Sequence, residues 1–467
     1  MRRLLLPLLV LCGTASAAYP QTPAPGVVHS SVAVLADSSN SYALYLPSAY
    51  SPARRWPLLL VFDPFARGEV AVKLFQDAAE QYGFLVVGSN NVRNFQDPAA
   101  AVQLLWKDVN ERYAIDPRRF YVAGLSGGAR VASSIALTCK TCVAGVIANG
   151  AGLLPSAVVP GPEVADWFLV AGTTDFNYPE LLRLDEALVA RHAAVRFVVY
   201  DGPHNWMPKE VAGRALAWLQ LRAMVRGAAP VDKEFLNQQF EERLAEAQAA
   251  QKRGDLLAAA RAEREIAEDF RPFRDVTEVA AAARSLASLE EFRKAQKNEQ
   301  AVLDLQDEVA NRLVSLVGAI AQGADEPATL LAQLRAAVGD AEREKKKGPD
   351  PARAQAIERA LASAFSYAAE GGQQAMLKKD YLPARDLFRA GEVILPDSAW
   401  ACYLLATAEA QLGEKKQAIQ ELNKAMDRGL TNAKLLDDPA FDRLRNEAGF
   451  KALVAKLSQR PASKPRS

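Results

Sequence analysis

Short apolar runs alternate with amphipathic stretches over residues 41–226, and this alternation limits the folds open to the chain. Several runs are nearly continuous in Val, Leu, Phe and Ile, which is typical of strands buried on both faces. The runs occupy residues 42–46, 58–62, 84–88, 120–124, 143–148, 167–171 and 195–200. Stretches between them, such as 70–82, 99–113 and 180–192, have helical periodicity. We therefore expect a mostly parallel sheet with helices on both faces.

The chain changes character after Gly227-Ala-Ala-Pro230. From about residue 233 the strand signals vanish, and Ala, Glu, Leu, Lys, Arg and Gln predominate, all of which favour helices. One helical face gathers apolar residues whose expected role is core packing: Val302, Leu305, Val309, Leu313, Leu316 and Ile320. An all-α region should therefore follow the sheet.

Near the end of the chain, small and large side chains recur at a period of 34 residues. The matching pairs are Ala384 and Ala418, Phe388 and Leu422, and Gly391 and Ala425. This period, with Pro396 closing the first unit, resembles the tetratricopeptide repeat. Gly371-Gly372 and Leu430 depart from the Leu-Gly and Pro that are usual in that repeat. The resemblance implies stacked helical hairpins, through which a protein or peptide partner could bind.

Gly124-x-Ser126-x-Gly128 is the strongest chemical signal in the sequence. It ends the apolar run 120–124, and a helical pattern begins at Ala129. A serine held between glycines, where a strand meets a helix, is typical of a nucleophile elbow, which lifts the hydroxyl above the sheet. A serine hydroxyl is a weak nucleophile, so a base must lie within hydrogen-bond reach.

The sequence contains three histidines, and the base can be chosen among them by elimination. After such an elbow, the acid and then the histidine follow the serine along the chain. His29 precedes the strands and is excluded by that order. His192 ends a helical stretch, where a histidine favours the helix terminus. His204 follows the last strand, at the edge where open sheets place their chemistry, and we expect it to be the general base.

Asp175 follows the run 167–171 in the same kind of position and is the expected acid. Its carboxylate would hold the imidazole of His204 in the correct tautomer and stabilise its charged form. Asp201 is a rival, but it lies so close to His204 in sequence that capping the turn is its expected role.

Acyl transfer also needs two hydrogen-bond donors for the oxyanion. We expect the backbone N–H of Gly127, the residue after the nucleophile, to be the first. The second should come from the loop 63–66, where Pro64 has no N–H, and Phe65 is the better candidate.

Residues 41–226 resemble the α/β-hydrolase superfamily, and within it the exported esterases related to polyhydroxybutyrate depolymerase and feruloyl esterase. The resemblance lies in stretches 56–62, 82–88, 115–128 and 202–206. It implies hydrolysis of an ester-containing substrate through an acyl-enzyme on Ser126, with no metal and no organic cofactor. The sequence departs from these families at Asp63-Pro64, where they usually carry His-Gly, and this departure concerns the oxyanion site.

Two other functions fit the same sequence. A serine peptidase would use the same triad, so only substrate trials separate it from an esterase. A non-catalytic binding protein would keep the fold as a scaffold and bind through the helical region, and Asp63-Pro64 favours this alternative. Residues 149–166 leave little room for a lid domain, so we expect an open site suited to an ester on a larger molecule.

The first residues have the order of a secretory signal: two arginines, an apolar stretch over 4–11 and small residues at 15–17. We expect export to a periplasm or out of the cell. Cys12 offers a lipoprotein alternative, although Leu11 stands before it where a small residue is usual. Past residue 20 no apolar run is long enough to span a membrane. The formal net charge of +1 gives no basic footprint for nucleic acid.

Cys139 and Cys142 follow a helical stretch and leave two interpretations open. They could close a small disulfide in an oxidising compartment, or they could be small residues in a helix-to-strand turn. A zinc site would need a second pair of ligands, and none is visible.

These patterns divide the chain into five segments. Residues 1–18 are the signal peptide and 26–226 the α/β-hydrolase domain. Residues 233–360 form a helical linker or degenerate repeat region, and 361–457 form the repeats with closing helices. The polar tail 458–467 is expected to be disordered.

Overall fold

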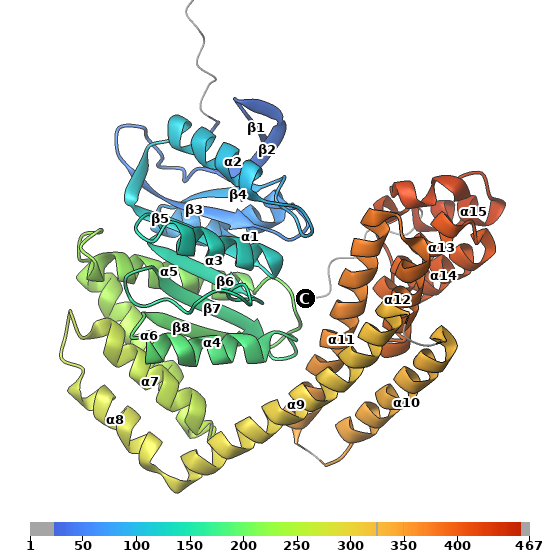
Figure 1. Ribbon diagram of the computed structural model, residues 1–467. Helices are drawn as coiled ribbons and strands as arrows, with labels where there is room; N and C mark the ends of the chain where they lie inside the picture. Colours follow the sequence, from blue (N-terminus) through green and yellow to red (C-terminus); the bar gives the residue numbers. More distant parts are fainter. Residues whose placement is uncertain (1–22, 324–325, 349, 459–467) are drawn as a thin grey trace, which may run out of the picture.

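The computed structural model describes residues 23–323, 326–348 and 350–458 (Figure 1). The expected signal peptide lies outside the described residues, as does all but the first residue of the expected tail. The described chain forms an eight-stranded sheet with helices on both faces, followed by helices alone. The architecture expected from the sequence, a mostly parallel sheet with helices on both faces followed by an all-α region, is confirmed.

The sheet has the strand order β1-β2-β4-β3-β5-β6-β7-β8. The strands are β1 (Val28–Val34), β2 (Asp37–Tyr45), β3 (Trp56–Phe62), β4 (Leu85–Ser89), β5 (Ile115–Leu125), β6 (Gly145–Asn149), β7 (Asp166–Gly172) and β8 (Val195–Tyr200). β1 and β2 pair antiparallel with their neighbours, and all pairs from β4 to β8 are parallel. The carboxyl ends of these parallel strands therefore share one edge.

Helices cover both faces because successive side chains of the central strands point to opposite faces. Leu58 and Leu60 of β3 pack on one face with α2 (Ala99–Arg112), α3 (Gly127–Thr138) and α4 (Tyr178–Ala190). Leu59 and Val61 pack on the other face with α1 (Gly68–Tyr82) and α5 (Lys209–Val225). Every residue of β3, β4, β6 and β7 is buried, as the nearly continuous apolar runs predict.

Three further helices complete this body: α6 (Lys233–Lys252), α7 (Leu256–Phe270) and α8 (Thr277–Ser288). Arg196 on the edge strand β8 is buried and forms ion pairs with Glu265 and Asp269 of α7. Trp218 of α5 donates its indole N–H to the same Asp269 carboxylate, 2.9 Å away. The helices after β8 therefore cover an edge that would otherwise be open to pairing with another strand.

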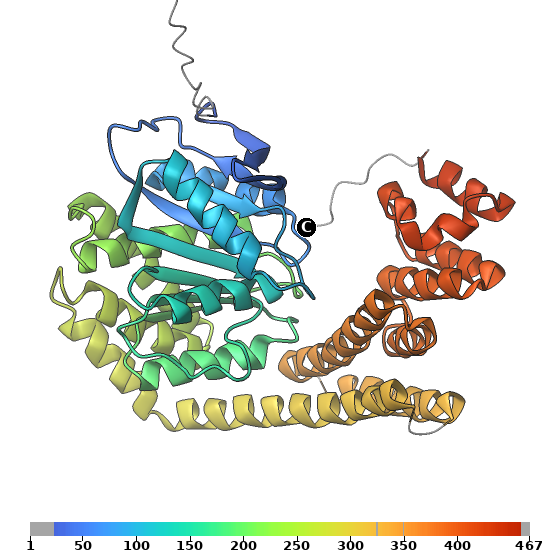
Figure 2. The same cartoon turned by 45° about the horizontal axis from the view of Figure 1, so that its top comes forward.

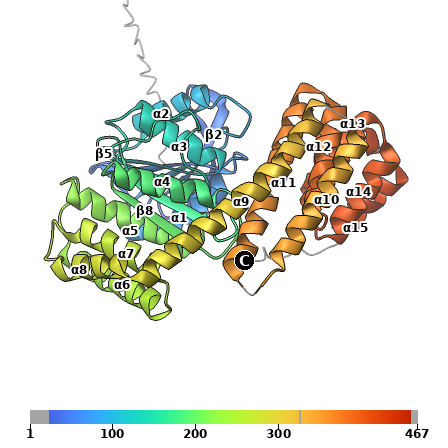
Figure 3. The ribbon, with the colours of Figure 1, turned by 60° about the horizontal axis from the view of Figure 1, so that its bottom comes forward.

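The remaining helices form what we call the helical arm. It consists of α9 (Glu290–Gln322), α10 (Pro327–Lys345), α11 (Pro351–Lys378), α12 (Tyr381–Ile394), α13 (Ala399–Leu412), α14 (Lys415–Asp427), the short 3-10 turns η1 (Ala433–Asp437) and η2 (Pro439–Leu444), and α15 (Ala448–Ser458). Figure 2 shows α9 running from the sheet body into the arm. α11 packs along α9, and the N-terminal end of α11 is the end that lies near the sheet (Figure 3). None of the helices in the described ranges is both long and apolar enough to cross a membrane.

The residues that recur at the 34-residue period are buried in the arm, on α12 and α14. A side chain at Gly372 would place its Cβ 2.3 Å from Cε1 of Phe388, so the glycine at this departure from the repeat pattern makes room for that ring. The tetratricopeptide assignment itself stays a prediction.

Cys139 and Cys142 are joined by a disulfide directly after α3, with their Cα atoms 5.6 Å apart. Of the two interpretations of this pair, the disulfide is therefore the one that the structure shows. Cys402 is a free, buried cysteine.

Candidate active site

Ser126, Asp175 and His204 follow β5, β7 and β8, so all three lie at the edge formed by the carboxyl ends of the strands. Residues far apart in the sequence thus meet at one edge, where open α/β sheets usually bind ligands. His29, by contrast, lies on β1 and not before the strands as expected, and its ring contacts the Ala24 carbonyl oxygen at 2.9 Å.

Ser126 occupies a strained turn between β5 and α3, with φ 54° and ψ −123°. A non-glycine residue reaches this region only when its surroundings enforce it. Both flanking glycines are needed for the close approach of strand and helix. A Cβ at Gly124 would lie 2.2 Å from the Gly128 carbonyl, and a Cβ at Gly128 would lie 2.0 Å from the Phe62 carbonyl oxygen. These features are those of a nucleophile elbow.

His204 and Asp175 are joined by a hydrogen bond of 2.8 Å between Nδ1 and Oδ1. The Asp175 side chain is fully buried, and its Oδ1 also accepts the N–H of Asn177 at 2.8 Å. With Nδ1 bonded to Asp175, Nε2 is the ring nitrogen left to exchange a proton. Asp201, the rival acid, instead accepts the Thr173 hydroxyl at 3.1 Å.

Asn149, at the end of β6, connects the elbow with the histidine loop. Its carbonyl oxygen accepts the N–H of Ser126 at 2.8 Å. Its side chain donates to the Asn205 carbonyl at 3.2 Å and accepts the Met207 N–H at 2.8 Å. In the structure, no hydrogen bond joins Ser126 Oγ directly to His204. Asn149 instead links Ser126 to Asn205, the residue after His204, and catalytic hydrogen bonds commonly tighten only when substrate binds.

Two aromatic residues hold the histidine loop. The ring of Phe176 packs against the imidazole of His204 with 4.1 Å between centroids. The single O–H of Tyr200 lies within hydrogen-bond distance of two carbonyl oxygens, those of Pro203 and Asn205, at 2.8 and 2.9 Å. Burial raises the pKa of Tyr200 to about 12, and the negative charge of Asp175 adds to this effect. The phenol therefore remains a neutral donor at physiological pH.

The two expected oxyanion donors, the N–H groups of Gly127 and Phe65, differ in their present hydrogen-bond partners. Gly127 is the first residue of α3, so its N–H has no acceptor within the helix. The N–H of Phe65 donates to the Asp63 carboxylate at 2.8 Å, and it would have to leave that bond to meet an oxyanion. Phe65 therefore stays a prediction, and it requires a local rearrangement.

Asp63 organises the loop at which the sequence departs from the His-Gly pattern. The carboxylate is fully buried and accepts two hydrogen bonds of 2.9 Å from the Arg67 guanidinium. It also accepts the indole N–H of Trp206 at 2.8 Å, which ties it to the histidine loop. The unusual aspartate thus gives this loop a fixed conformation.

Asn94, on the loop after β4, lies beside the elbow. Its backbone N–H donates to the Pro64 carbonyl at 2.9 Å, which joins its loop to the one after β3. Its side chain lies against Gly127, because a Cβ added there would come within 1.9 Å of Asn94 Oδ1. That oxygen is an acceptor, whereas the donor of the same amide, Nδ2, would lie 3.3 Å from the added Cβ, so Asn94 is a second candidate donor through Nδ2.

The described residues between β6 and β7 form no lid domain, as the short connection in the sequence predicted. That connection contains turns but no helix, and Ser126 is partly exposed. Phe65 and Phe95 lie on the loops after β3 and β4 and are 57% and 39% exposed. They offer an apolar surface at the same edge as Ser126.

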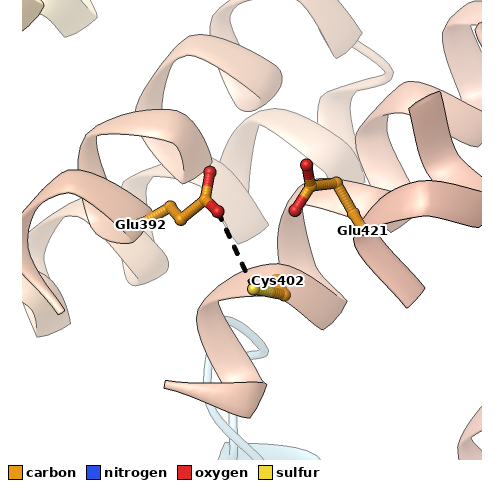
Figure 4. Close-up of side chains that lie close together, drawn as sticks. All are labelled: Glu392, Cys402 and Glu421. Carbon is orange, nitrogen blue, oxygen red and sulfur yellow. Dashed lines mark hydrogen bonds between the residues drawn. The ribbon is translucent and has the colours of Figure 1, made fainter. Parts of the chain in front are cut away.

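A different cluster lies in the arm, where Glu392, Cys402 and Glu421 come close together (Figure 4). Lys424 contacts Glu392 and Glu421 at 3.1 and 2.7 Å, and Arg428 contacts Glu392 and the Cys402 sulfur. Burial raises the pKa of the Cys402 thiol to about 11, so the thiol stays protonated at neutral pH. The two cations compensate the carboxylates, and we therefore assign this cluster to an ion-pair network.

Comparison with models of protein families and with curated protein sequences gave no match. Among solved structures, the chain is similar to a substrate-bound, fluorophosphonate-binding serine hydrolase from Staphylococcus aureus, with 14% identity, a TM-score of 0.34, and coverage of 42% of this chain and 98% of that one. It is also similar to the feruloyl esterase module from Clostridium thermocellum complexed with sinapinate, with 15% identity, a TM-score of 0.34, and coverage of 42% and 88%. A third is S-formylglutathione hydrolase from Staphylococcus aureus, with 14% identity, a TM-score of 0.32, and coverage of 38% and 90%.

Proposed function

We propose that the protein is an exported serine hydrolase that cleaves carboxylic esters through a Ser126-His204-Asp175 triad and an acyl-enzyme. The observation that carries the proposal is the hydrogen bond between His204 Nδ1 and Asp175 Oδ1, at the same sheet edge as the strained Ser126 turn. A buried carboxylate bonded to a histidine near a serine held in this turn suits general-base catalysis.

In the proposed reaction, Ser126 Oγ attacks the ester carbonyl carbon and His204 Nε2 takes its proton. Asp175 stabilises the imidazolium that results. His204 then gives that proton to the departing alkoxide, which leaves as an alcohol, and the acyl group remains on Ser126. Water attacks the acyl-enzyme by the same route and releases the carboxylic acid. The sequence of steps is complete without a metal or an organic cofactor.

Donors beside Ser126 would stabilise the negative charge on the carbonyl oxygen. We assign the first to the N–H of Gly127, at the start of α3. For the second, Phe65 must release Asp63, whereas the amide of Asn94 already lies against Gly127. We therefore keep Phe65 and Asn94 as candidates for the second donor, and Asn94 is the better placed of the two.

The open edge and the exposed rings of Phe65 and Phe95 favour an ester whose acyl or aryl group rests on an apolar surface while the rest remains in solvent. Export is proposed from the N-terminal signal pattern, and the Cys139–Cys142 disulfide fits an oxidising compartment. A protein or peptide partner for the helical arm also remains a proposal.

A non-catalytic binding role is the alternative that one observation favours, namely the engagement of the Phe65 N–H by Asp63. A steady-state assay separates the two functions. The purified chain without residues 1–18 would be given p-nitrophenyl esters of increasing acyl length and, in parallel, peptide p-nitroanilides. Ester turnover that is lost in Ser126→Ala and His204→Ala, but kept in the control His29→Ala, supports the esterase. Cleavage of the anilides alone supports a peptidase, and absence of all turnover supports the binding role.

A further inference from the structure

Two side chains of the helical arm reach the loop that carries Asp175. Arg359 of α11 donates from Nη1 to the Thr173 carbonyl oxygen at 2.8 Å. Gln306 of α9 donates from Nε2 to the Phe176 carbonyl oxygen at 3.5 Å. These contacts lie on either side of Asp175 in the sequence. The arm therefore holds both ends of the short segment that positions the expected acid.

Arg359 is a buried residue of this junction and not a surface side chain. The residue is 4% exposed. Its Nε donates to Gln306 Oε1 at 2.5 Å, and its guanidinium lies 4.7 Å from the centroid of the Tyr178 ring. A buried cation is costly unless it is bonded and compensated. Burial lowers the pKa of Arg359, and the negative charges of Asp175 and Glu358 oppose that shift, so the guanidinium stays charged at neutral pH.

The buried Asp175 carboxylate, in turn, needs a positive charge nearby. Its side chain is fully buried, and Oδ1 serves His204 and Asn177. In the described part of the chain, Oδ2 has no hydrogen-bond partner. A buried carboxylate with one unpaired oxygen depends on nearby positive charge and on a rigid loop to keep its orientation. Arg359 supplies the charge and also fixes Thr173.

Phe176 extends the connection to the histidine. Its backbone carbonyl is the acceptor of Gln306, and its ring packs on the imidazole of His204. Loss of the arm contacts would therefore loosen both the acid and the surface against which the base rests.

We propose that Arg359, held in place by Gln306, is a positioning residue for Asp175, so that the helical arm is part of the hydrolase site. This inference rests on the function proposed above. It deepens that function, because the state of the arm would regulate catalysis through the Thr173–Phe176 segment.

The test compares Arg359→Gln and Gln306→Leu with a matched control, Arg183→Gln. Arg183 of α4 forms an ion pair with Asp307 of α9, so it crosses the same junction, but both side chains are about half exposed and it bonds neither Thr173 nor Phe176. Unfolding temperatures would first establish that the variants are folded. If Arg359→Gln does not fold, Gln306→Leu takes its place in the comparison.

The direct readout is the downfield proton NMR resonance of the His204 Nδ1–H bonded to Asp175, which is assigned by its loss in His204→Ala and does not depend on turnover. We expect this resonance to weaken or shift upfield in Arg359→Gln and Gln306→Leu and to stay unchanged in Arg183→Gln. With an ester substrate, kcat should fall about 10-fold to 100-fold in the first two, with KM changed less than about 3-fold, because a small misplacement of a catalytic group has effects of this size.

A folded Arg359→Gln with the wild-type resonance and kcat would overturn the inference. A wild type without the resonance would also overturn it, because the Asp175–His204 bond would then be missing in solution. If the wild type has the resonance but hydrolyses no substrate, the proposed function fails while the resonance still decides the role of Arg359.

Discussion

Gly150 lies in direct contact with His204, since a Cβ at Gly150 would come within 2.9 Å of His204 Cε1. The same Cβ would lie 3.0 Å from Oδ2 of Asp175. The backbone at Gly150 has φ +65°, a region that side-chain-bearing residues enter at a cost. The connection after β6 thus passes against the histidine–aspartate pair, and glycine is needed there for conformation and for space.

Gly150→Ala should lower kcat for ester hydrolysis by about 100-fold, because the added methyl group displaces His204 or Asp175. The positive φ should also destabilise the variant by about 1–2 kcal/mol. Gly227→Ala is a matched control, since Gly227 has the same φ of +65° but no atom within 4 Å of its added Cβ. Steady-state kinetics and thermal unfolding of both variants check the prediction. Equal losses of kcat in the two variants would contradict it.

Asn94→Ala should lower kcat by about 10-fold to 1000-fold with little change in KM, since the amide next to Gly127 would act mainly in the transition state. Gln96→Ala, on the same loop and exposed, should behave as the wild type. Steady-state kinetics with one p-nitrophenyl ester decide the matter. Full activity in Asn94→Ala would exclude its amide and point to the Phe65 N–H, released from Asp63, as the second donor.

The buried carboxyl of Glu409, in α13, should make the free energy of unfolding depend on pH. Burial raises the pKa of this carboxyl to about 7; the negative charge of Glu421 adds to the shift and Arg389 opposes it. An unfolded glutamate titrates near 4.5. Between these values the folded state keeps a proton that the unfolded state has lost, so stability falls as pH rises from about 4.5 to 7.

Glu409→Gln should remove this dependence and raise the free energy of unfolding at pH 8 by up to about 3.5 kcal/mol, since the pKa difference of the wild type corresponds to roughly 1.4 kcal/mol per unit. At pH 4 the variant and the wild type should be nearly equal. Urea unfolding at both pH values measures the effect, with Glu370→Gln as an exposed control on α11. A wild type and variant that lose stability in parallel between pH 4 and 8 would refute the assignment.

Local patterns in the sequence predicted the sheet, its helices and the place of Ser126. Apolar runs and glycine spacing depend on neighbouring residues, and the order of Ser126, Asp175 and His204 follows from where parallel strands end. The structure places these residues at one edge, with Asp175 bonded to His204.

Other parts of the site could not be predicted from local patterns. Asn149, Gly150 and Asn94 have no distinctive spacing, and their contacts exist only because the loops after β3, β4 and β6 meet in space. Arg359 contacts Thr173 across the junction between arm and sheet. An arginine within a helix-forming stretch resembles any surface arginine until the packing of that helix is known. The composition change at 227–230 likewise marks the end of the strands and carries no information on which helices pack against them.

If Ser126 is an activated nucleophile, it should react covalently with a fluorophosphonate probe. The experiment compares the chain without residues 1–18 with Ser126→Ala and with Ser134→Ala, a control on the following helix α3. We predict labelling of the wild type and of Ser134→Ala, and none of Ser126→Ala. A folded wild type that remains unlabelled, or a Ser126→Ala variant that still labels, would contradict the claim.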